Sequence, residues 1–166
     1  MSETPEIKQQ LPEREKKIAD NIAIKLGKDV LGIEIKPKRI KVKIKYKCIK
    51  KAANYFKTEL NLDHIVSVSG VDYPNDNEIE VVYHAGTYER KDLRDLLIAL
   101  AYRIPRENPK TQTLIDIWPS IEYDERETHE MLGVFFEGHP KLEKLFLPED
   151  WNDKPPLRKD FKNPGR

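Results

Sequence analysis

The sequence predicts an α+β fold, a mixed or antiparallel sheet with helices on one face, followed by an extended C-terminal tail. Residues 40–47 alternate between apolar side chains and lysine, which is typical of a half-buried strand. Residues 64–71 and 78–84 are strand-like stretches on either side of a turn rich in Asp and Asn, as in a hairpin. Residues 12–26 place apolar side chains four positions apart, as on one face of a helix. Strands and helices in this order fit a two-layer α+β domain.

The N-terminal segment, residues 1–37, is expected to hold one helix and a connector. Residues 1–12 are polar, and Pro12 then opens the helical pattern, which Gly27 ends. Residues 28–39 contain a short apolar patch, and we predict that they form the connector.

Residues 38–132 are predicted to form the α+β domain itself. After the strand at 40–47, apolar residues at helical spacing predict a helix over residues 48–60, and the hairpin follows. Residues 105–111 are expected to be a polar loop, and a further helix is expected from about residue 123 to residue 132.

Two residues are predicted to mark the ends of this last helix. Asp124 is expected to cap its N-terminus through the side-chain carboxylate. Gly133 is expected to end it, because glycine readily adopts the left-handed conformation that closes many helices.

The stretch 96–104 is ambiguous from its residues alone. Its Leu, Ala and Arg content favours a helix. Apolar residues nevertheless alternate from Ile98 to Ile104, and Pro105 follows, which favours a strand.

The composition indicates one domain of ordinary size with a modest core. Of the 166 residues, 38% are hydrophobic and 36% are charged, and the net charge is +1. The single cysteine, Cys48, excludes an internal disulfide framework and a cysteine-held cluster within this chain. No apolar run is long enough to span a bilayer, and the N-terminus lacks the apolar core of a signal peptide. We therefore expect a reducing, intracellular environment.

The helix around residues 125–130 allows three interpretations. Glu125 and His129 share one helix face, as do Arg126 and Glu130. A metal or acid–base site would need a further ligand, and His139 is the only imidazole near them in sequence. The other interpretations are a solvated helix with internal ion pairs and a helix that docks against a partner protein.

The lysine-rich region, residues 25–51, also allows three interpretations. It could bind nucleic acid, as a free-standing basic module. It could face an acidic protein or lipid surface. The third interpretation is a solvated edge strand whose lysines prevent aggregation.

The stretch from Glu125 to Phe161 resembles the signature of the thirty-kilodalton subunit (the C subunit) of respiratory complex I and of energy-converting membrane-bound hydrogenases. The residues that carry the resemblance match the family pattern in three short runs; they are Glu125, Arg126, Glu127, Glu130, Gly133, Phe136, Gly138, His139 and Pro140, then Trp151, then Leu157, Arg158, Lys159, Asp160 and Phe161. The family often has aspartate at the position of Glu130 and Gly-His where Lys154-Pro155 stands here. Relatives carry a strand just before Pro105, so we expect a strand at 96–104.

The resemblance implies a structural subunit with no cofactor, no metal and no catalytic residue of its own. Such subunits lie in the hydrophilic arm of a membrane-attached redox complex, on the cytoplasmic side of the cell membrane. They pack against the large catalytic subunit, of the nickel–iron hydrogenase type or the quinone-site type, and lie beside an iron–sulfur subunit. The matching residues of the three runs are the expected partner-binding residues.

The short, lysine-rich chain favours a membrane-bound hydrogenase or a related ferredoxin-linked complex, with a complex I-type NADH/quinone dehydrogenase as the alternative. The nucleic-acid-binding module remains the alternative of a different class.

Residues 133–166 are predicted to form an extended tail that wraps around the partner. Several prolines exclude long regular elements, and too few apolar residues are present for a separate core. The tail must therefore lie on its own domain or on another protein. We expect the second, with Phe136, Trp151, Leu157 and Phe161 as apolar anchors and with Arg158 and Asp160 setting the register.

Overall fold

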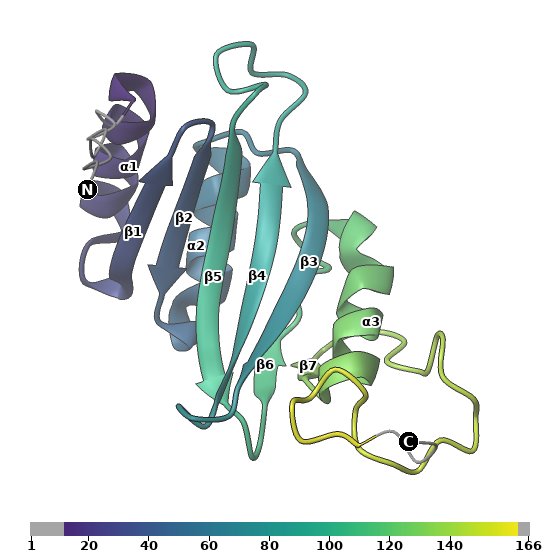
Figure 1. The fold of residues 1–166 in the computed structure, drawn as a ribbon. Coiled ribbons are helices and arrows are strands. Elements are labelled where there is room, and N and C mark those ends of the chain that lie inside the picture. Colours follow the sequence, from purple (N-terminus) through teal and green to yellow (C-terminus); the bar gives the residue numbers. More distant parts are fainter. Residues whose placement is uncertain (1–11, 163–166) are drawn as a thin grey trace, which may run out of the picture.

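The computed structural model describes residues 12–162 (Figure 1). The polar stretch before Pro12 and the last four residues of the predicted tail lie outside the described residues. The α-helices are α1 (Glu13–Leu26), α2 (Ile49–Thr58) and α3 (Glu122–Leu132). The strands are β1 (Val30–Lys36), β2 (Arg39–Ile44), β3 (His64–Tyr73), β4 (Glu78–Gly86), β5 (Leu97–Pro105), β6 (Lys110–Gln112) and β7 (Phe135–Glu137). Short 3-10 turns occupy Gly27–Asp29, Tyr46–Cys48 and Pro119–Ile121.

Five strands form one mixed sheet in the order β1-β2-β5-β4-β3. β2 and β5 are parallel, and the other neighbouring pairs are antiparallel. β6 and β7 form a separate, parallel two-stranded sheet beside α3. The predicted α+β class, with a mixed sheet, is confirmed.

The helices cover one face of the five-stranded sheet, and the core lies between the two layers (Figure 1). Val42 of β2 and Leu100 of β5 are fully buried on this face, as are Ile22 of α1 and Phe56 of α2. Each side chain of this size contributes about 1.5–3 kcal/mol when it is fully removed from water.

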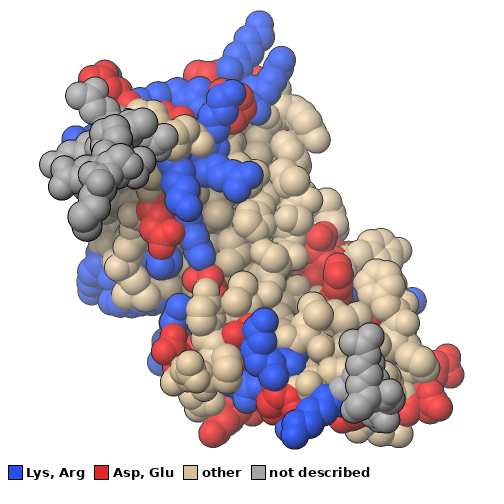
Figure 2. Space-filling view, in the orientation of Figure 1, with Lys and Arg blue, Asp and Glu red and all other residues tan. Residues whose placement is uncertain are grey.

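Within residues 12–162, no helix lies on the opposite face of the sheet. Lys41 crosses this face to Glu80, with 2.7 Å between Nζ and Oε2, and Glu80 is 2% exposed. Small apolar residues occupy the middle of the face, where Val82, Ala99 and Ala101 form a minor cluster. Figure 2 shows this face, with basic side chains gathered over β1 and β2 and an uncharged area over the strands beyond them.

The expected connector at 28–39 is wrong in its central part, which forms strand β1. A bulge between Val30 and Gly32 interrupts the alternation of apolar residues, so only the four residues 33–36 show the strand period in the sequence, too short a stretch to indicate a strand. β1 pairs with β2 through a two-residue turn in which Lys38 has φ of +60°. The boundary expected between residues 37 and 38 falls within this turn, and the core continues across it.

The strand expected at 96–104 is confirmed as β5, which lies between β2 and β4 in the sheet. Alternation therefore outweighed helix propensity, since the side chains at Ile98 and Ile104 are fully buried under the helices. The strand expected at 40–47 is shorter than predicted. It ends at Ile44, and Tyr46 lies in a 3-10 turn, 38% exposed, rather than on the apolar face.

The end of α3 matches the prediction and its beginning does not. Gly133 has φ of +77° and its N–H bonds to the carbonyl of His129, as in a left-handed helix cap. Asp124 does not cap the helix, which begins after Ile121 without a side-chain cap. Its carboxylate instead accepts a hydrogen bond of 3.4 Å from the backbone N–H of Val68 on β3.

The expected loop at 105–111 runs into β6, and the expected tail begins with β7. Residues 138–162 form no helix or strand and make up the tail seen at the lower right of Figure 1.

Candidate partner-docking surface

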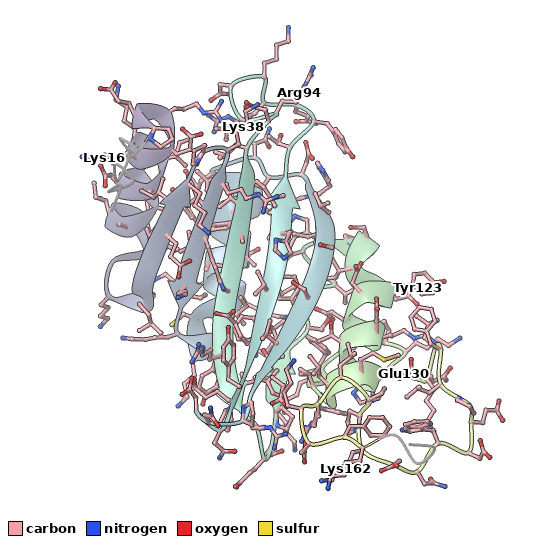
Figure 3. All side chains as sticks on the ribbon, in the orientation of Figure 1. Lys16, Lys38, Arg94, Tyr123, Glu130 and Lys162 are labelled. Carbon is pink, nitrogen blue, oxygen red and sulfur yellow. The ribbon has the colours of Figure 1, made fainter. Side chains whose placement is uncertain are left out.

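Two charged side chains of α3 hold the first part of the tail. Arg126 donates from Nε to the carbonyl of Glu143 (3.2 Å) and from Nη2 to the carbonyl of Lys144 (3.1 Å). Glu130 accepts hydrogen bonds from the backbone N–H groups of residues 145–147, at 3.1, 2.9 and 2.8 Å. Glu130 lies between α3 and the tail (Figure 3). We call residues 143–151 the clamped loop.

Both clamping side chains are buried, Arg126 at 6% and Glu130 at 7% exposure. Burial on its own would raise the pKa of Glu130, but the three backbone N–H donors outweigh burial and hold this pKa below its usual value. Glu130 is therefore ionised near neutral pH, and its bonds to the loop are charge-assisted.

Lys144 stabilises the second half of the clamped loop. Its ammonium group donates to the carbonyls of Pro148, Glu149 and Trp151, at 3.3, 2.9 and 2.7 Å. This lysine therefore satisfies backbone groups of its own loop. The loop conformation is set by side-chain bonds to backbone, not by an apolar core.

A second set of contacts holds the end of the tail against β3. Asp72 of β3 accepts two hydrogen bonds from Arg106, at 2.6 and 3.0 Å, and one of 2.8 Å from the backbone N–H of Lys159. Arg106 also bonds to Asp160, which accepts a further bond of 2.8 Å from Lys154. The bonds from Arg106 lower the pKa of Asp72, and those from Lys154 and Arg106 lower the pKa of Asp160 to about 2.

The tail also bonds directly to the C-terminal turn of α3. Leu157 donates its backbone N–H to the carbonyl of Met131 at 2.9 Å, and Arg158 donates from Nε to the carbonyl of Leu132 at 2.8 Å. Arg158 thus satisfies a helix carbonyl that has no partner within α3. The described part of the tail thus lies on its own domain. The sequence allowed either this placement or one on another protein, and we had expected the second.

Four large apolar side chains remain exposed along α3, β7 and the tail. They are Tyr123 (59%), Phe135 (45%), Phe146 (64%) and Leu157 (58%). Trp151 and Phe161 are partly buried against each other, with 5.8 Å between their ring centroids. The structure therefore leaves apolar surface on this side of the molecule although the tail is folded back.

The expected partner-binding residues fall into two groups. Several serve the interior, among them Glu125 (0% exposed) and Phe136 (1%), while Gly133 and Gly138 have positive φ values at turns. The exposed members are Glu127, Gly138, Pro140, Leu157, Lys159 and Asp160. A docking role for these residues stays a prediction, and only the exposed members can contact a partner directly.

Glu125 is held by three donors inside the protein. Oε1 accepts from the hydroxyl of Tyr83 (2.8 Å) and from the backbone N–H of Leu114 (3.0 Å), and Oε2 accepts from the hydroxyl of Thr113. Burial raises the pKa of Glu125, and these donors offset only part of that effect. Glu125 therefore ties α3 to β4 and to the segment after β6.

The three residues weighed as metal ligands have other bonding partners. His129 donates from Nδ1 to the carbonyl of Val134 (2.8 Å), and His139 donates from Nε2 to the carbonyl of Glu122 (3.1 Å). Within residues 12–162 there is no group of three His, Cys, Asp or Glu side chains that could hold a metal ion.

The lysines of the region 25–51 are partly neutralised by carboxylates of the same chain. Besides the bond between Lys41 and Glu80, Lys51 lies 2.6 Å from Asp29 and Lys50 lies 2.9 Å from Asp116. These pairs reduce the positive potential that nucleic-acid binding would require.

Sequence reasoning did not identify Asp72 and Arg106 as residues that hold the tail. Asp72 lies 87 positions before the Lys159 amide that it binds, and no local pattern reports such a pairing. Exposed Tyr123 and Phe135 were also missed, because Tyr123 stands at the start of the predicted helix and Phe135 in the predicted tail, outside the residues that carry the family pattern. Among the described residues, no helix is long and apolar enough to cross a membrane.

Comparison with known proteins gives a match over most of the chain. A family model described as the 30 Kd subunit of respiratory-chain NADH dehydrogenase matches residues 42–166. The chain is 39% identical over 130 residues to the C subunit of the F(420)H(2) dehydrogenase of Methanosarcina mazei, a match that covers 78% of this chain and 79% of that protein. It is also 39% identical over 103 residues to the C subunit of the NADH-quinone oxidoreductase of Roseiflexus sp., covering 61% of this chain and 56% of that relative. The chain thus spans little more than half the length of the second relative.

Solved structures give the same result. A chain in the structure of the membrane-bound sulfane sulfur reductase, an archaeal respiratory membrane complex, matches with a TM-score of 0.75 and 27% identity, over 89% of this chain and 85% of that one. A trypsin-resistant fragment of Nqo5 has the same fold, with a TM-score of 0.64 and 24% identity, over 78% of this chain and 99% of the fragment. The signature at residues 125–161, the family model and the relative from Methanosarcina mazei agree, and the chain belongs to the family of the 30 Kd subunit of respiratory-chain NADH dehydrogenase, also called the C subunit.

Proposed function

We propose that the chain is a non-catalytic structural subunit in the hydrophilic arm of a membrane-bound redox complex, where it docks onto the large catalytic subunit. The docking surface would consist of α3, β7 and the tail. The observation that carries this proposal is the exposed apolar set Tyr123, Phe135, Phe146 and Leu157 on a segment that is otherwise held in place by polar bonds. Aromatic and aliphatic side chains of this kind are typical of the energetic centre of protein interfaces.

The comparisons support an assembly of this type. The relatives from Methanosarcina mazei and Roseiflexus sp. are named as subunits of dehydrogenases, and the sulfane sulfur reductase is described as a respiratory membrane complex. The match covers 79% of the relative from Methanosarcina mazei and 85% of the sulfane sulfur reductase chain, against 56% of the NADH-quinone oxidoreductase relative. We propose a membrane-bound hydrogenase or a related ferredoxin-linked complex first, and a complex I-type dehydrogenase, the class to which the names of the two dehydrogenase relatives point, as the alternative. We propose a peripheral place on the cytoplasmic face of the membrane, beside an iron–sulfur subunit.

The test is deletion of residues 140–166 in cells that make the complex, with an affinity tag at the N-terminus of the chain. We expect the truncated chain to fold but to lose stoichiometric copurification with the large subunit from detergent-solubilised membranes. Unchanged copurification would contradict the proposed function, in which the tail is part of the docking surface.

Deletion of the tail also exposes the buried Arg126 and Glu130. A second variant therefore separates a loss of docking from a loss of stability. Leu157→Asp changes a side chain that is 58% exposed and leaves the clamp in place. We expect normal thermal stability and reduced copurification. Ile24→Asp on α1 changes a side chain that is 78% exposed, at the β1 edge of the sheet and away from α3 at the β3 edge, and it is the matched control.

A further inference from the structure

Phe146 is the most exposed large apolar residue of α3, β7 and the tail, at 64%, yet it stands on a loop whose backbone is held firmly. The amides on either side of it and its own amide all bind Glu130. The carbonyls just before them bind Arg126, and those just after them bind Lys144. The side chain of Phe146 therefore projects from a backbone that needs little further ordering.

This arrangement favours binding for an entropic reason. Ordering a loop at an interface costs free energy for each side chain and backbone segment that is immobilised. A loop that is already held in the free protein avoids most of that cost.

The charges around Phe146 define the partner's chemistry. Residues 143–153 contain four exposed carboxylates, on Glu143, Glu149, Asp150 and Asp153. The one lysine of this stretch, Lys144, directs its ammonium group to carbonyls of the loop. With four carboxylates against one lysine, residues 143–153 are acidic although the whole chain has a net charge of +1. Lys141 lies 3.5 Å from Glu143 and offsets one of these carboxylates.

We propose that Phe146 is a pre-ordered anchor that enters an apolar pocket on the partner subunit, and that lysine or arginine residues line the rim of this pocket. This inference rests on the proposed function, and it names the anchor and the partner's chemistry. The acidic loop would be repelled by an anionic lipid surface. A two-fold contact between two such loops of the same chain would bring like charges together.

The first experiment measures retention of the chain in the isolated complex. We expect Phe146→Ala to weaken retention by roughly tenfold or more, as for a central interface aromatic. Ile24→Ala removes exposed apolar surface of similar size from α1 and should have no effect. Because Phe146 is mostly exposed, both variants should unfold at the temperature of the unmodified chain.

The second experiment tests the rim. Glu149→Lys with Asp150→Lys should slow association at low salt, and the difference from the unmodified chain should shrink as salt is added. Association that is unaffected or accelerated would overturn a basic rim.

The third experiment identifies the pocket by placing a photoreactive benzoylphenylalanine at position 146 in the assembled complex. We expect one crosslinked peptide from another subunit, apolar at the attachment point and with Lys or Arg nearby. A crosslink to lipid, to a second copy of this chain or to an acidic peptide would overturn the proposal. If deletion of the tail abolishes docking while Phe146→Ala does not weaken it, the anchor is wrong and the proposed function stands. If deletion leaves docking intact, the proposed function fails.

Discussion

Arg126 and Glu130 stand one turn apart on α3 and bind consecutive parts of the same loop backbone. Arg126 binds the carbonyls of residues 143 and 144, and Glu130 binds the amides of residues 145–147. The two side chains form no ion pair with each other within the described part of the chain. Each uses its charge on backbone groups instead, so one helical turn determines the conformation of five residues that have no regular structure.

Loss of the Glu130 carboxylate should release the clamped loop. In Glu130→Ala the three amides lose their acceptor, and leaving such donors unpaired costs about 1–3 kcal/mol. We expect amide hydrogen exchange at residues 145–147 to accelerate by roughly tenfold or more, with α1 and α2 unchanged. Glu127→Ala removes an exposed carboxylate from the same helix and is the control. Equal exchange in the two variants would contradict the clamp.

Glu125 should make the stability of the fold depend on pH in an unusual direction. Burial raises its pKa above the ordinary 4.5. The native state thus holds the proton more firmly than the unfolded state, and the resulting stabilisation is present below pH 4.5 and is lost as the pH rises through the raised native value. Glu125→Gln should remove this contribution, which urea titrations from mildly acidic to mildly alkaline pH can measure. A pH dependence identical in both proteins would contradict a buried, shifted carboxyl.

Truncation at the same position should be far more harmful than the amide substitution. Glu125→Ala leaves the hydroxyls of Tyr83 and Thr113 and the amide of Leu114 without an acceptor. We expect a loss of about 3–5 kcal/mol in the free energy of unfolding, because each unpaired buried donor adds its own cost. Glu125→Gln keeps an acceptor and a group of the same size, so its loss near neutral pH should be about 1 kcal/mol or less.

The end of the tail should separate from β3 in acid before the core unfolds. The pKa of Asp160 is lowered from 3.8 to about 2 by its bonds to Lys154 and Arg106. Its contribution is present above the unfolded value of 3.8 and is lost as the pH falls through about 2. Fluorine NMR of fluorotryptophan-labelled protein can follow this, since Trp151 stacks on Phe161 of the tail and Trp118 is buried in the core at 1% exposure. We expect the Trp151 signal to change at a higher pH than that of Trp118, and simultaneous changes would contradict a separate tail.

Gly70 of β3 should not tolerate a larger side chain. A Cβ atom there would overlap with Cδ1 of Leu132 on α3, so the buried Leu132 side chain would have to move within the core. We expect Gly70→Ala to lower the free energy of unfolding by about 1–3 kcal/mol, as overpacked substitutions do. Gly32→Ala, where a Cβ would have no atom within 4 Å, is the matched control in β1. Equal melting temperatures for the two variants would show that α3 does not pack closely on β3.

The order of most elements was predictable because their signals are local. The spacing of four in α1, the alternation in β5 and the glycine that ends α3 each depend on the geometry of one segment. β1 was missed because its bulge interrupts the alternation by one residue. Asp124 was misassigned as a cap because its carboxylate accepts a hydrogen bond from the backbone N–H of Val68, 56 positions earlier on β3, and not from an amide of its own helix.

The pattern of residues was enough to establish the α+β class and the family signature at residues 125–161, whereas the strand at the centre of the sheet also needed the resemblance to the family. The folded arrangement was needed to show that Glu125 is interior, that the tail returns to α3 and β3, and that Phe146 is presented on a held loop. The physical reason is that the clamp joins side chains to backbone groups. Every residue has a carbonyl and every residue but proline an amide, so no pattern of residue types shows which of them a distant Arg126, Glu130 or Asp72 will bind.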